Sequence, residues 1–421
     1  MWADHAIWWQ IYPLGFTGAE RTAQPAVVHR LSHLENWLDY AVELGCSGLL
    51  LGPVFASETH GYDTIDHFRI DPRLGDDADF DRLVAAAHAR GLRIALDGVF
   101  NHVARSFAPP SSAGPAGSYF RYRPDGTLDT FEGHEHLIAL DHSQPAVAQY
   151  VADVLRHWLA RGVDAWRLDA AYAVPPEFWR TVVPRDEYPD AWFFGEVIHG
   201  DYAGYVATSG LDSVTQYELW KAIWSSLNDG NFFELSYALG RHNALLDTFV
   251  PQTFVGNHDV TRIATKLTDE RHLGHALAIL FTVGGVPSVY SGDEQAFHGV
   301  KEDRAGGDDA VRPAFPETPA GLAPYGWPTY RLHQLLIGVR RRNPWLSWAR
   351  TQVEHLTNQL VALRSTGDEA TVLLLLNLSD QAEHFPVDAT GLTFEVGDEP
   401  DEDPLLVPAH GWRLLTGPGD S

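Results

Sequence analysis

Strand-like and helix-like segments alternate along most of this chain, and that alternation constrains the fold more than any other feature of the sequence. Several strand-like segments are continuous apolar runs, such as SGLLLG at 47–52, which is typical of strands buried on both faces. Helical patterns separate them; one covers 77–91, with acidic residues at its start and a closing glycine. The predicted strands cover residues 6–12, 47–52, 92–98, 164–169, 192–197, 211–216, 252–256 and 286–292. These eight strands alternating with helices predict an α/β fold of the (β/α)8 TIM-barrel type, with a doubly wound open sheet as the alternative.

Two segments interrupt the alternation and indicate further units. Residues 103–141 are rich in Pro, Gly, Ser and His and are too long for an ordinary loop, so they predict a small excursion after the third strand. From residue 346 onward, short strand-like segments separated by turns predict a C-terminal antiparallel β-sandwich. The chain of 421 residues is therefore divided into a barrel (1–102 and 142–345), the excursion (103–141) and the C-terminal β domain (346–421).

Composition and charge narrow the classes of partner and location. The 56 acidic and 30 basic side chains give a formal net charge of −26, which argues against binding to nucleic acid or to an anionic membrane. Cys46 is the single cysteine, so no intrachain disulfide is possible and nothing indicates an oxidising compartment. The N-terminal residues lack a signal-peptide pattern, and no apolar run approaches the roughly 20 residues of a membrane span. We expect a cytoplasmic protein, and the sequence leaves its oligomeric state open.

Polar side chains gather at the carboxyl ends of four predicted strands. They are Asp97, Asn101 and His102 after the third strand, Asp169 after the fourth, Glu196 after the fifth, and His258 and Asp259 after the seventh. In a barrel these ends share one face, where the active sites of this fold are built. On the fourth strand Arg167 and Asp169 point the same way, because side chains two apart share a face. The two residues form either a structural ion pair or a site in which Arg167 orients Asp169 as a reacting carboxylate.

The same stretches, in this order, resemble the motifs of the α-amylase family of glycoside hydrolases (glycoside hydrolase family 13). The matching stretches are HGYDTIDHFRIDPRLG (60–75), DGVFNH (97–102), GVDAWRLDAA (162–171), FFGEV (193–197) and FVGNHD (254–259). The resemblance is nearest to cyclomaltodextrinases and other maltooligosaccharide-cleaving members. It implies cleavage of a glycosidic bond with retention, through a covalent glycosyl-enzyme intermediate.

The resemblance also implies a role for each candidate residue. Asp169 matches the family's nucleophile, Glu196 its acid/base, and Asp259 the third carboxylate, which holds sugar hydroxyls in the transition state. Arg167 is expected to keep Asp169 ionised by lowering its pKa. The residues matched to substrate binding are Tyr62, His102, Arg167, His258 and Arg312, with Asp97 as structural support.

Residues near the nucleophile bear on linkage and on metal binding. Ala170 follows Asp169, and in this family a small residue there accompanies α-1,4 rather than α-1,6 specificity, so we predict cleavage of α-1,4 bonds in short linear or cyclic maltooligosaccharides. Secreted members hold a structural calcium through the equivalent of Asn101, an aspartate of the excursion and a histidine after the nucleophile motif. Residues 170–178 supply no such histidine, which argues against that calcium, and no cofactor is expected to be required.

Other functions stay open on the sequence alone. Transglycosylation, isomerisation of a disaccharide and α-1,6 cleavage would use the same site, and an inert sugar-binding protein would share the fold. A metal-dependent hydrolase built on His102, His134 and His136 is a further alternative. The acidic stretch GDDADF at 75–80 is interpreted as a helix cap rather than a cation loop.

Overall fold

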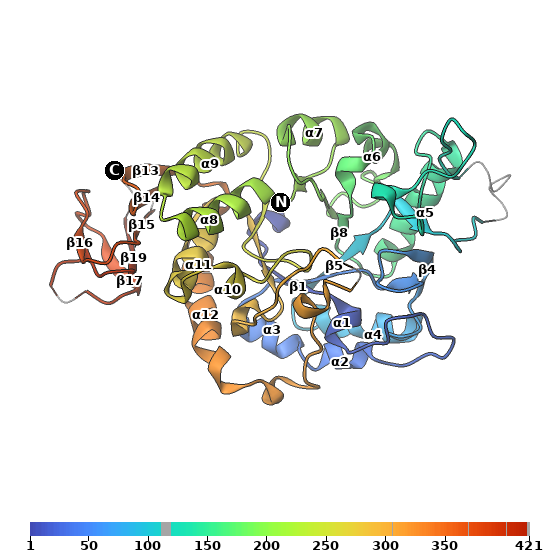
Figure 1. Cartoon of the computed structure of the whole chain (residues 1–421), viewed down its shortest axis with the longest axis horizontal. Coiled ribbons are helices and arrows are strands. Elements are labelled where there is room, and N and C mark those ends of the chain that lie inside the picture. Colours follow the sequence, from blue (N-terminus) through green and yellow to red (C-terminus); the bar gives the residue numbers. More distant parts are fainter. Residues whose placement is uncertain (111–118, 305, 369, 401, 419–421) are drawn as a thin grey trace.

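A closed barrel of parallel strands forms the centre of the computed structural model, which describes residues 1–110, 119–304, 306–368, 370–400 and 402–418 (Figure 1). Its strands are β1 (Trp8–Ile11), β2 (Gly48–Leu51), β5 (Arg93–Gly98), β8 (Ala165–Leu168), β9 (Trp192–Gly195), β10 (Ser213–Val214), β11 (Gln252–Phe254) and β12 (Val286–Tyr290). They run in the order β10-β9-β8-β5-β2-β1-β12-β11. A parallel bridge between Thr215 and Gln252 joins the two outer strands, so the sheet closes on itself. The barrel prediction is confirmed, and the open-sheet alternative is wrong.

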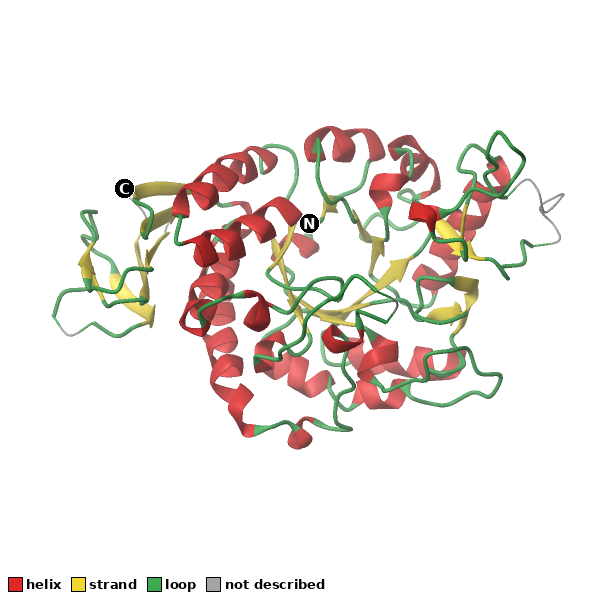
Figure 2. Ribbon diagram, in the orientation of Figure 1, coloured by secondary structure: helices red, strands yellow, loops and turns green. Residues whose placement is uncertain are grey.

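Helices surround this barrel on the outside (Figure 2). They are α1 (Pro13–Phe16), α2 (Leu31–Glu35), α3 (Leu38–Leu44), α4 (Asp77–His88), α5 (Pro145–Ala160), α6 (Pro176–Val182), α7 (Tyr202–Ser209), α8 (Tyr217–Asp229), α9 (Phe232–Leu245), α10 (Ile263–Lys266), α11 (Leu273–Thr282) and α12 (Trp327–Arg342). In α5, Val147, Val151 and Leu155 lie at helical spacing and are fully buried against the barrel. In the described part of the chain, no helix is both long enough and apolar enough to cross a lipid bilayer.

The acidic stretch at 75–80 forms the N-terminal cap of α4, as predicted. The Asp76 carboxylate accepts hydrogen bonds from the backbone N–H groups of Ala78 and Asp79, and the Asp79 carboxylate accepts one from the N–H of Asp76. These contacts satisfy donors that the first turn of a helix leaves without partners. The sequence pattern at this point therefore has a structural explanation.

Short strands and loops extend the barrel on the side where the carboxyl ends of its strands lie. β3 (Phe55–Ser57) and β4 (Thr64–Ile70) form a hairpin after β2. Within and beside the predicted excursion, β6 (His102–Ala104) pairs with β7 (Leu137–Ala139), and the short helix η4 (Phe131–Gly133) lies between them in sequence. The ring of Phe131 stacks on His102, with centroids 4.5 Å apart and planes at 12°. The excursion thus packs on the end of the third barrel strand; residues 111–118 of it lie outside the described part of the chain.

The C-terminal part is an antiparallel sheet, at the left of Figure 1 beside α11 and α12. Its strands are β13 (Thr351–Leu356), β14 (Leu360–Thr366), β15 (Ala370–Asn377), β19 (Trp412–Pro418) and β17 (Thr393–Gly397), in that order, and β16 (Glu383–His384) pairs with β18 (Leu406–Val407). In β15, Leu374 and Leu376 join the core shared with the barrel, while Leu373 and Leu375 join a second core with Phe385 and Val407. Burial on both faces explains why this strand is apolar at almost every position.

Candidate active site

Arg167, at the end of β8, lies at the centre of a buried group of carboxylates and holds three of them. Its Nη1 lies 2.8 and 2.7 Å from the two carboxylate oxygens of Asp97 and 3.0 Å from Oδ1 of Asp169. Its Nη2 lies 2.9 Å from Oε1 of Glu196. The parallel register aligns Asp97 of β5 with Arg167 of β8, and Asp169 and Glu196 follow directly after β8 and β9. The charged pair on the fourth strand is therefore both an ion pair and part of a larger site.

The pKa of Asp169 depends on several groups that act in opposite directions. Burial raises the pKa of Asp169 above its usual range, and the carboxylates of Glu196, Asp97 and Asp259 add to this, whereas Arg167 opposes it. Arg167 acts in the predicted direction, since it lowers the pKa of Asp169, but the other effects are larger and the net shift is upward. One guanidinium shared among three carboxylates does not compensate for the loss of water around them. The carboxyl group of Asp169 therefore holds a proton more readily than an isolated one.

Glu196 is fixed in place by contacts from three directions. Besides Arg167, the backbone N–H of Ala170 donates to its Oε2 at 3.0 Å, and the hydroxyl of Tyr217 donates to its Oε1 at 3.2 Å. Ala170 has φ 44° and ψ 37°, a left-handed conformation that costs a non-glycine residue roughly 1–2 kcal/mol. Strained backbone of this kind is concentrated at functional sites, where surrounding contacts maintain it. Ala170 thus has a backbone role beside the linkage preference predicted for its small side chain.

Asp259 lies in the loop after β11, where its carboxylate contacts Arg312 and His258. Arg312 donates from Nη2 to its Oδ1 at 2.7 Å, and Nε2 of His258 lies 2.9 Å from its Oδ2. Loss of water would raise the pKa of Asp259, but His258, Arg312 and Arg167 together lower it well below its usual range. The guanidinium of Arg312 also lies over the ring of Tyr12, 4.6 Å from its centroid. Asp259 is consequently ionised throughout the ordinary pH range.

Tyr62 and His102 line the cleft and contact each other, and the hydroxyl of Tyr62 also contacts the Asp97 carboxylate. The Tyr62 ring stacks on His258, with centroids 5.4 Å apart, and its hydroxyl donates to Oδ2 of Asp97 at 2.9 Å and contacts Nε2 of His258. Nε2 of His102 lies 3.1 Å from the carbonyl oxygen of Tyr62, and its Nδ1 lies 3.1 Å from the amide nitrogen of Asn101. Burial lowers the pKa of His102 to about 3, so the ring is neutral. Both of its nitrogens are engaged within the protein.

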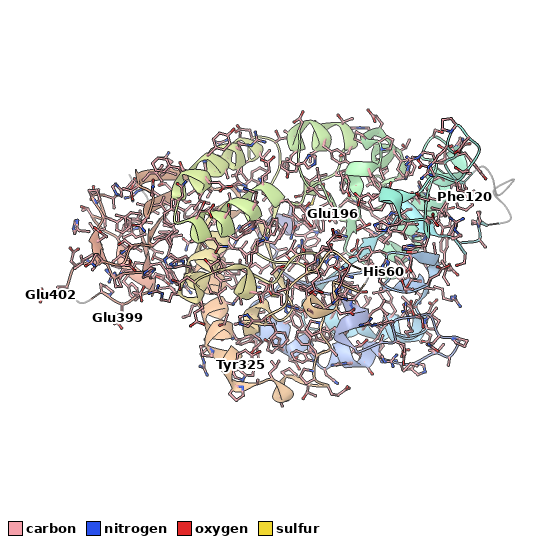
Figure 3. All side chains as sticks on the ribbon, viewed as in Figure 1. His60, Phe120, Glu196, Tyr325, Glu399 and Glu402 are labelled. Carbon is pink, nitrogen blue, oxygen red and sulfur yellow. The ribbon has the colours of Figure 1, made fainter. Side chains whose placement is uncertain are left out.

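A cleft of about 1440 Å³ opens above these groups. The predicted site residues that line it are Tyr62, His102, Asp169, Glu196, Asp259 and Arg312. Asp97, Arg167 and His258 lie beneath its surface and are 1%, 3% and 1% exposed. Figure 3 labels two of the lining side chains, Glu196 and His60, near the centre of the molecule. The structure thus brings all the predicted residues together, but it places Arg167 and His258, which were predicted to bind substrate, as supports of other side chains.

Several residues of the cleft were not predicted from the sequence. Tyr217 holds Glu196, and nothing in its surroundings in the sequence indicated this. Tyr12 follows the first barrel strand, so the reasoning on strand ends could have found it. The hydroxyl of Tyr172 donates to Oε1 of Glu132 at 2.9 Å, which joins the excursion to the loop after the nucleophile motif. Glu132 is itself left-handed, with φ 49°.

The alternative of a metal-dependent hydrolase has no support in the described part of the chain. The rings of His134 and His136 have centroids 5.8 Å apart and line the cleft. Two groups of the described residues bring three His, Cys, Asp or Glu ligand atoms within 4.8 Å of one another. Neither group includes His102, His134 or His136. Those groups are Asp269 with His272 and His410, and His29 with Asp76 and Asp79.

Known proteins share both the sequence pattern and the fold of this chain. Residues 10–118 and 128–325 match the family described as alpha amylase, catalytic domain. A cyclomaltodextrinase of Geobacillus thermopakistaniensis is 28% identical over 93% of this chain and 72% of its own length. An intracellular maltogenic amylase of Bacillus subtilis is 28% identical over 71% of this chain and 56% of its own length. The ligand-free structure of a cyclic α-maltosyl-(1→6)-maltose hydrolase from Arthrobacter globiformis superposes with a TM-score of 0.81 at 24% identity, covering 99% of both chains, which shows a common fold.

Proposed function

The chain belongs to the α-amylase family of glycoside hydrolases, and we propose that it hydrolyses α-1,4-glucosidic bonds of short linear or cyclic maltooligosaccharides with retention of configuration. One observation carries the proposal: a single guanidinium, that of Arg167, holds the carboxylates of Asp169 and Glu196 at the base of a cleft that also contains ionised Asp259. The cyclomaltodextrinase and the maltogenic amylase with 28% identity support the choice of substrate class.

The proposed reaction uses the two carboxyl groups in two steps. In the first, an oxygen of Asp169 attacks the anomeric carbon while Glu196 gives its proton to the departing glycosidic oxygen. In the second, Glu196 takes a proton from a water molecule, which attacks the anomeric carbon and releases Asp169. Asp259 accepts hydrogen bonds from sugar hydroxyls, and its negative charge favours the cation-like transition state. The contacts from Ala170 and Tyr217 keep Glu196 oriented through both steps.

The reaction class and the linkage are tested together on wild-type protein. We expect kcat/KM to be higher on maltotriose and on a cyclodextrin than on isomaltotriose, and proton NMR of the earliest products to show the α-anomer. A difference of one small group in a pocket discriminates by only about 1–3 kcal/mol, so the preference for α-1,4 bonds is expected to be incomplete.

Higher kcat/KM on isomaltotriose would overturn the linkage proposal, and products longer than the substrate would favour transglycosylation. An initial β-anomer would exclude the covalent mechanism. Wild-type protein is preferred to an Ala170→Val variant, because a β-branched residue is disfavoured at φ 44°.

Removing the cation beside Asp259 is expected to shift the acidic side of the pH profile. Arg312 lowers the pKa of Asp259, so in Arg312→Ala this pKa rises and Asp259 becomes protonated at a higher pH. In the wild type Asp259 is ionised throughout the ordinary pH range, so its protonation does not limit kcat/KM there. In Arg312→Ala we expect its protonation to enter that range, so that kcat/KM falls at a higher pH than in the wild type as the solution is acidified. Arg304→Ala, at another residue lining the cleft, is the matched control and is expected to leave the profile in place. An unshifted profile in Arg312→Ala would remove Arg312 from the proposed role.

We propose that catalysis requires no metal ion. Asn101, which the resemblance connects with calcium, has another partner, since its side chain contacts His102 at 3.1 Å. Dialysis against EDTA is expected to leave kcat on maltotriose unchanged at a temperature where the protein stays folded. A loss of kcat that added calcium restores would contradict this proposal.

The proposal makes a neutral α-glucan oligosaccharide the partner of the cleft. The formal net charge of −26 opposes association with nucleic acid and anionic lipid but does not hinder an uncharged sugar. The Bacillus subtilis relative is named an intracellular maltogenic amylase, which supports a cytoplasmic location for this chain as well.

A further inference from the structure

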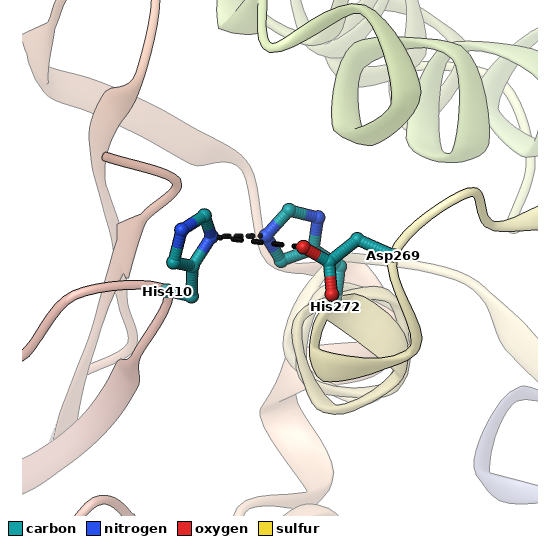
Figure 4. Close-up of side chains that lie close together, drawn as sticks. All are labelled: Asp269, His272 and His410. Atoms are coloured by element: carbon teal, nitrogen blue, oxygen red, sulfur yellow. Dashed lines mark hydrogen bonds and ion pairs between the residues drawn. The ribbon is translucent and has the colours of Figure 1, made fainter. Parts of the chain in front are cut away.

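A second cluster of ionisable side chains lies where the barrel meets the C-terminal sheet (Figure 4). Asp269 and His272 belong to the segment just before and within the short helix η6 (Glu270–His272), which leads into α11. His410 lies on the turn before β19, so it comes from the C-terminal sheet. Nε2 of His272 lies 3.0 Å from Nδ1 of His410, and Oδ2 of Asp269 lies 3.9 Å from the same Nδ1. None of these three residues lines the cleft described above.

A carboxylate on the far side of the His410 ring orients this histidine within the cluster. Nε2 of His410 lies 2.8 Å from Oδ1 of Asp380, so this nitrogen carries the proton and donates it to the carboxylate. In the tautomer that carries its one proton on Nε2, Nδ1 has a lone pair that faces His272 and Asp269. A carboxylate behind an imidazole in this way fixes the tautomer and makes the opposite nitrogen a stronger ligand, as is common for histidines that bind metal ions.

His272 is able to contribute a second lone pair at the same place. Its side chain is only 6% exposed, and its Nε2 faces Nδ1 of His410 at 3.0 Å. With its proton on Nε2, His272 donates a hydrogen bond to His410. With its proton on Nδ1 instead, the two imidazoles and the Asp269 carboxylate offer three electron pairs to one point and no proton.

The charges around the cluster also accommodate a cation. Arg271 is the positive group beside it and donates from Nη2 to Oδ2 of Asp269 at 2.6 Å. Nε of Arg271 lies 2.9 Å from Oδ1 and 3.1 Å from Oδ2 of the same carboxylate. A metal ion on Oδ2 would replace the longer of these two contacts and leave the shorter one in place. Asp269 and Asp380 carry two negative charges against the one positive charge of Arg271, whose side chain is 57% exposed.

We propose that Asp269, His272 and His410 bind a divalent transition-metal ion of the zinc class, which ties the C-terminal sheet to the barrel. Two imidazole nitrogens and one carboxylate oxygen are typical zinc ligands, with water in the fourth position. At a zinc–nitrogen distance of about 2.05 Å and tetrahedral angles, two ligand nitrogens lie about 3.3 Å apart. The observed 3.0 Å between the imidazole nitrogens needs only a small adjustment. Calcium and magnesium prefer oxygen ligands, so two imidazoles disfavour them.

Zinc binding to the full-length protein tests this proposal directly. After removal of metal with a chelator, we expect calorimetric titration with zinc chloride to give one saturable site per chain, and zinc to raise Tm. The variant Asp380→Asn keeps all three ligands but weakens the orienting hydrogen bond, so we expect zinc affinity to fall about 10- to 100-fold. The Asp380 side chain is 92% exposed, so this variant should fold like the wild type. His410→Ala is expected to lose the site and the rise in Tm.

A matched control is available elsewhere on the surface. His29 lies 2.5 Å from Asp79 in the other histidine–carboxylate group, and its side chain is 61% exposed. His29→Ala is expected to bind zinc like the wild type. The proposal is overturned if the wild type shows no saturable zinc site, if Asp380→Asn and His410→Ala bind zinc unchanged, or if His29→Ala is the variant that loses it.

Discussion

Asp169→Asn is expected to reduce kcat/KM on maltotriose at least about 10³-fold, because an amide cannot form the ester with the anomeric carbon. We expect this variant to fold, because the contacts around Asp169 are largely kept. Arg167 keeps its contacts to Asp97 and Glu196, and one buried negative charge is removed from a crowded group. We therefore expect a Tm equal to or above that of the wild type, measured by circular dichroism. Kinetics on maltotriose and the melting curve together separate loss of chemistry from loss of structure.

Two further variants make the role of Asp169 specific. Asp97→Asn removes another carboxylate on Arg167, but Asp97 is 1% exposed beneath the cleft, so its loss is expected to lower activity much less. Asp169→Gly leaves space for a small anion, and added azide is expected to restore cleavage of an activated α-glycoside and to yield the β-glycosyl azide. Wild-type activity in Asp169→Asn would show that Asp169 is not the nucleophile.

Glu196→Gln is expected to reduce kcat on maltooligosaccharides by about 10²- to 10⁴-fold, because the departing oxygen loses its proton donor. The size of the loss is expected to depend on the leaving group. An α-glycosyl fluoride needs little help from an acid, so the first step should stay fast. The second step lacks its general base and should be slow. Release of fluoride is therefore expected to show a rapid burst followed by a slow steady state.

The matched control for this variant is Glu132→Gln, which changes another glutamate that lines the same cleft. Glu132 contacts Tyr172 rather than the central carboxylates, so no burst and only a small change in kcat are expected. If Glu196→Gln cleaved maltotriose at the wild-type rate, Glu196 would have no part in proton transfer.

The fold was predictable from the sequence to a large extent, because the signals that specify it are local. Apolar runs such as residues 47–52 mark strands buried on both faces, and the stripe of Val147, Val151 and Leu155 marks a helix packed on them. The shortest barrel strand is β10 (Ser213–Val214). Here the predicted segment, 211–216, exceeds the observed strand by more residues than at any other barrel strand. Its pairing depends on neighbours that the local pattern does not reveal.

The sequence by itself determined which residues gather at the site, since the carboxyl ends of parallel strands in a barrel meet on one face. Asp97, Asp169, Glu196 and Asp259 follow from that rule and from their places in the chain. Only the tertiary structure decided which of these groups form ion pairs and in which direction their pKa values shift. Arg167 proved to hold three carboxylates, and the net pKa of Asp169 is raised rather than lowered. The physical reason is that desolvation and electrostatic interactions depend on every charge nearby in space, and most of those charges lie far apart along the chain.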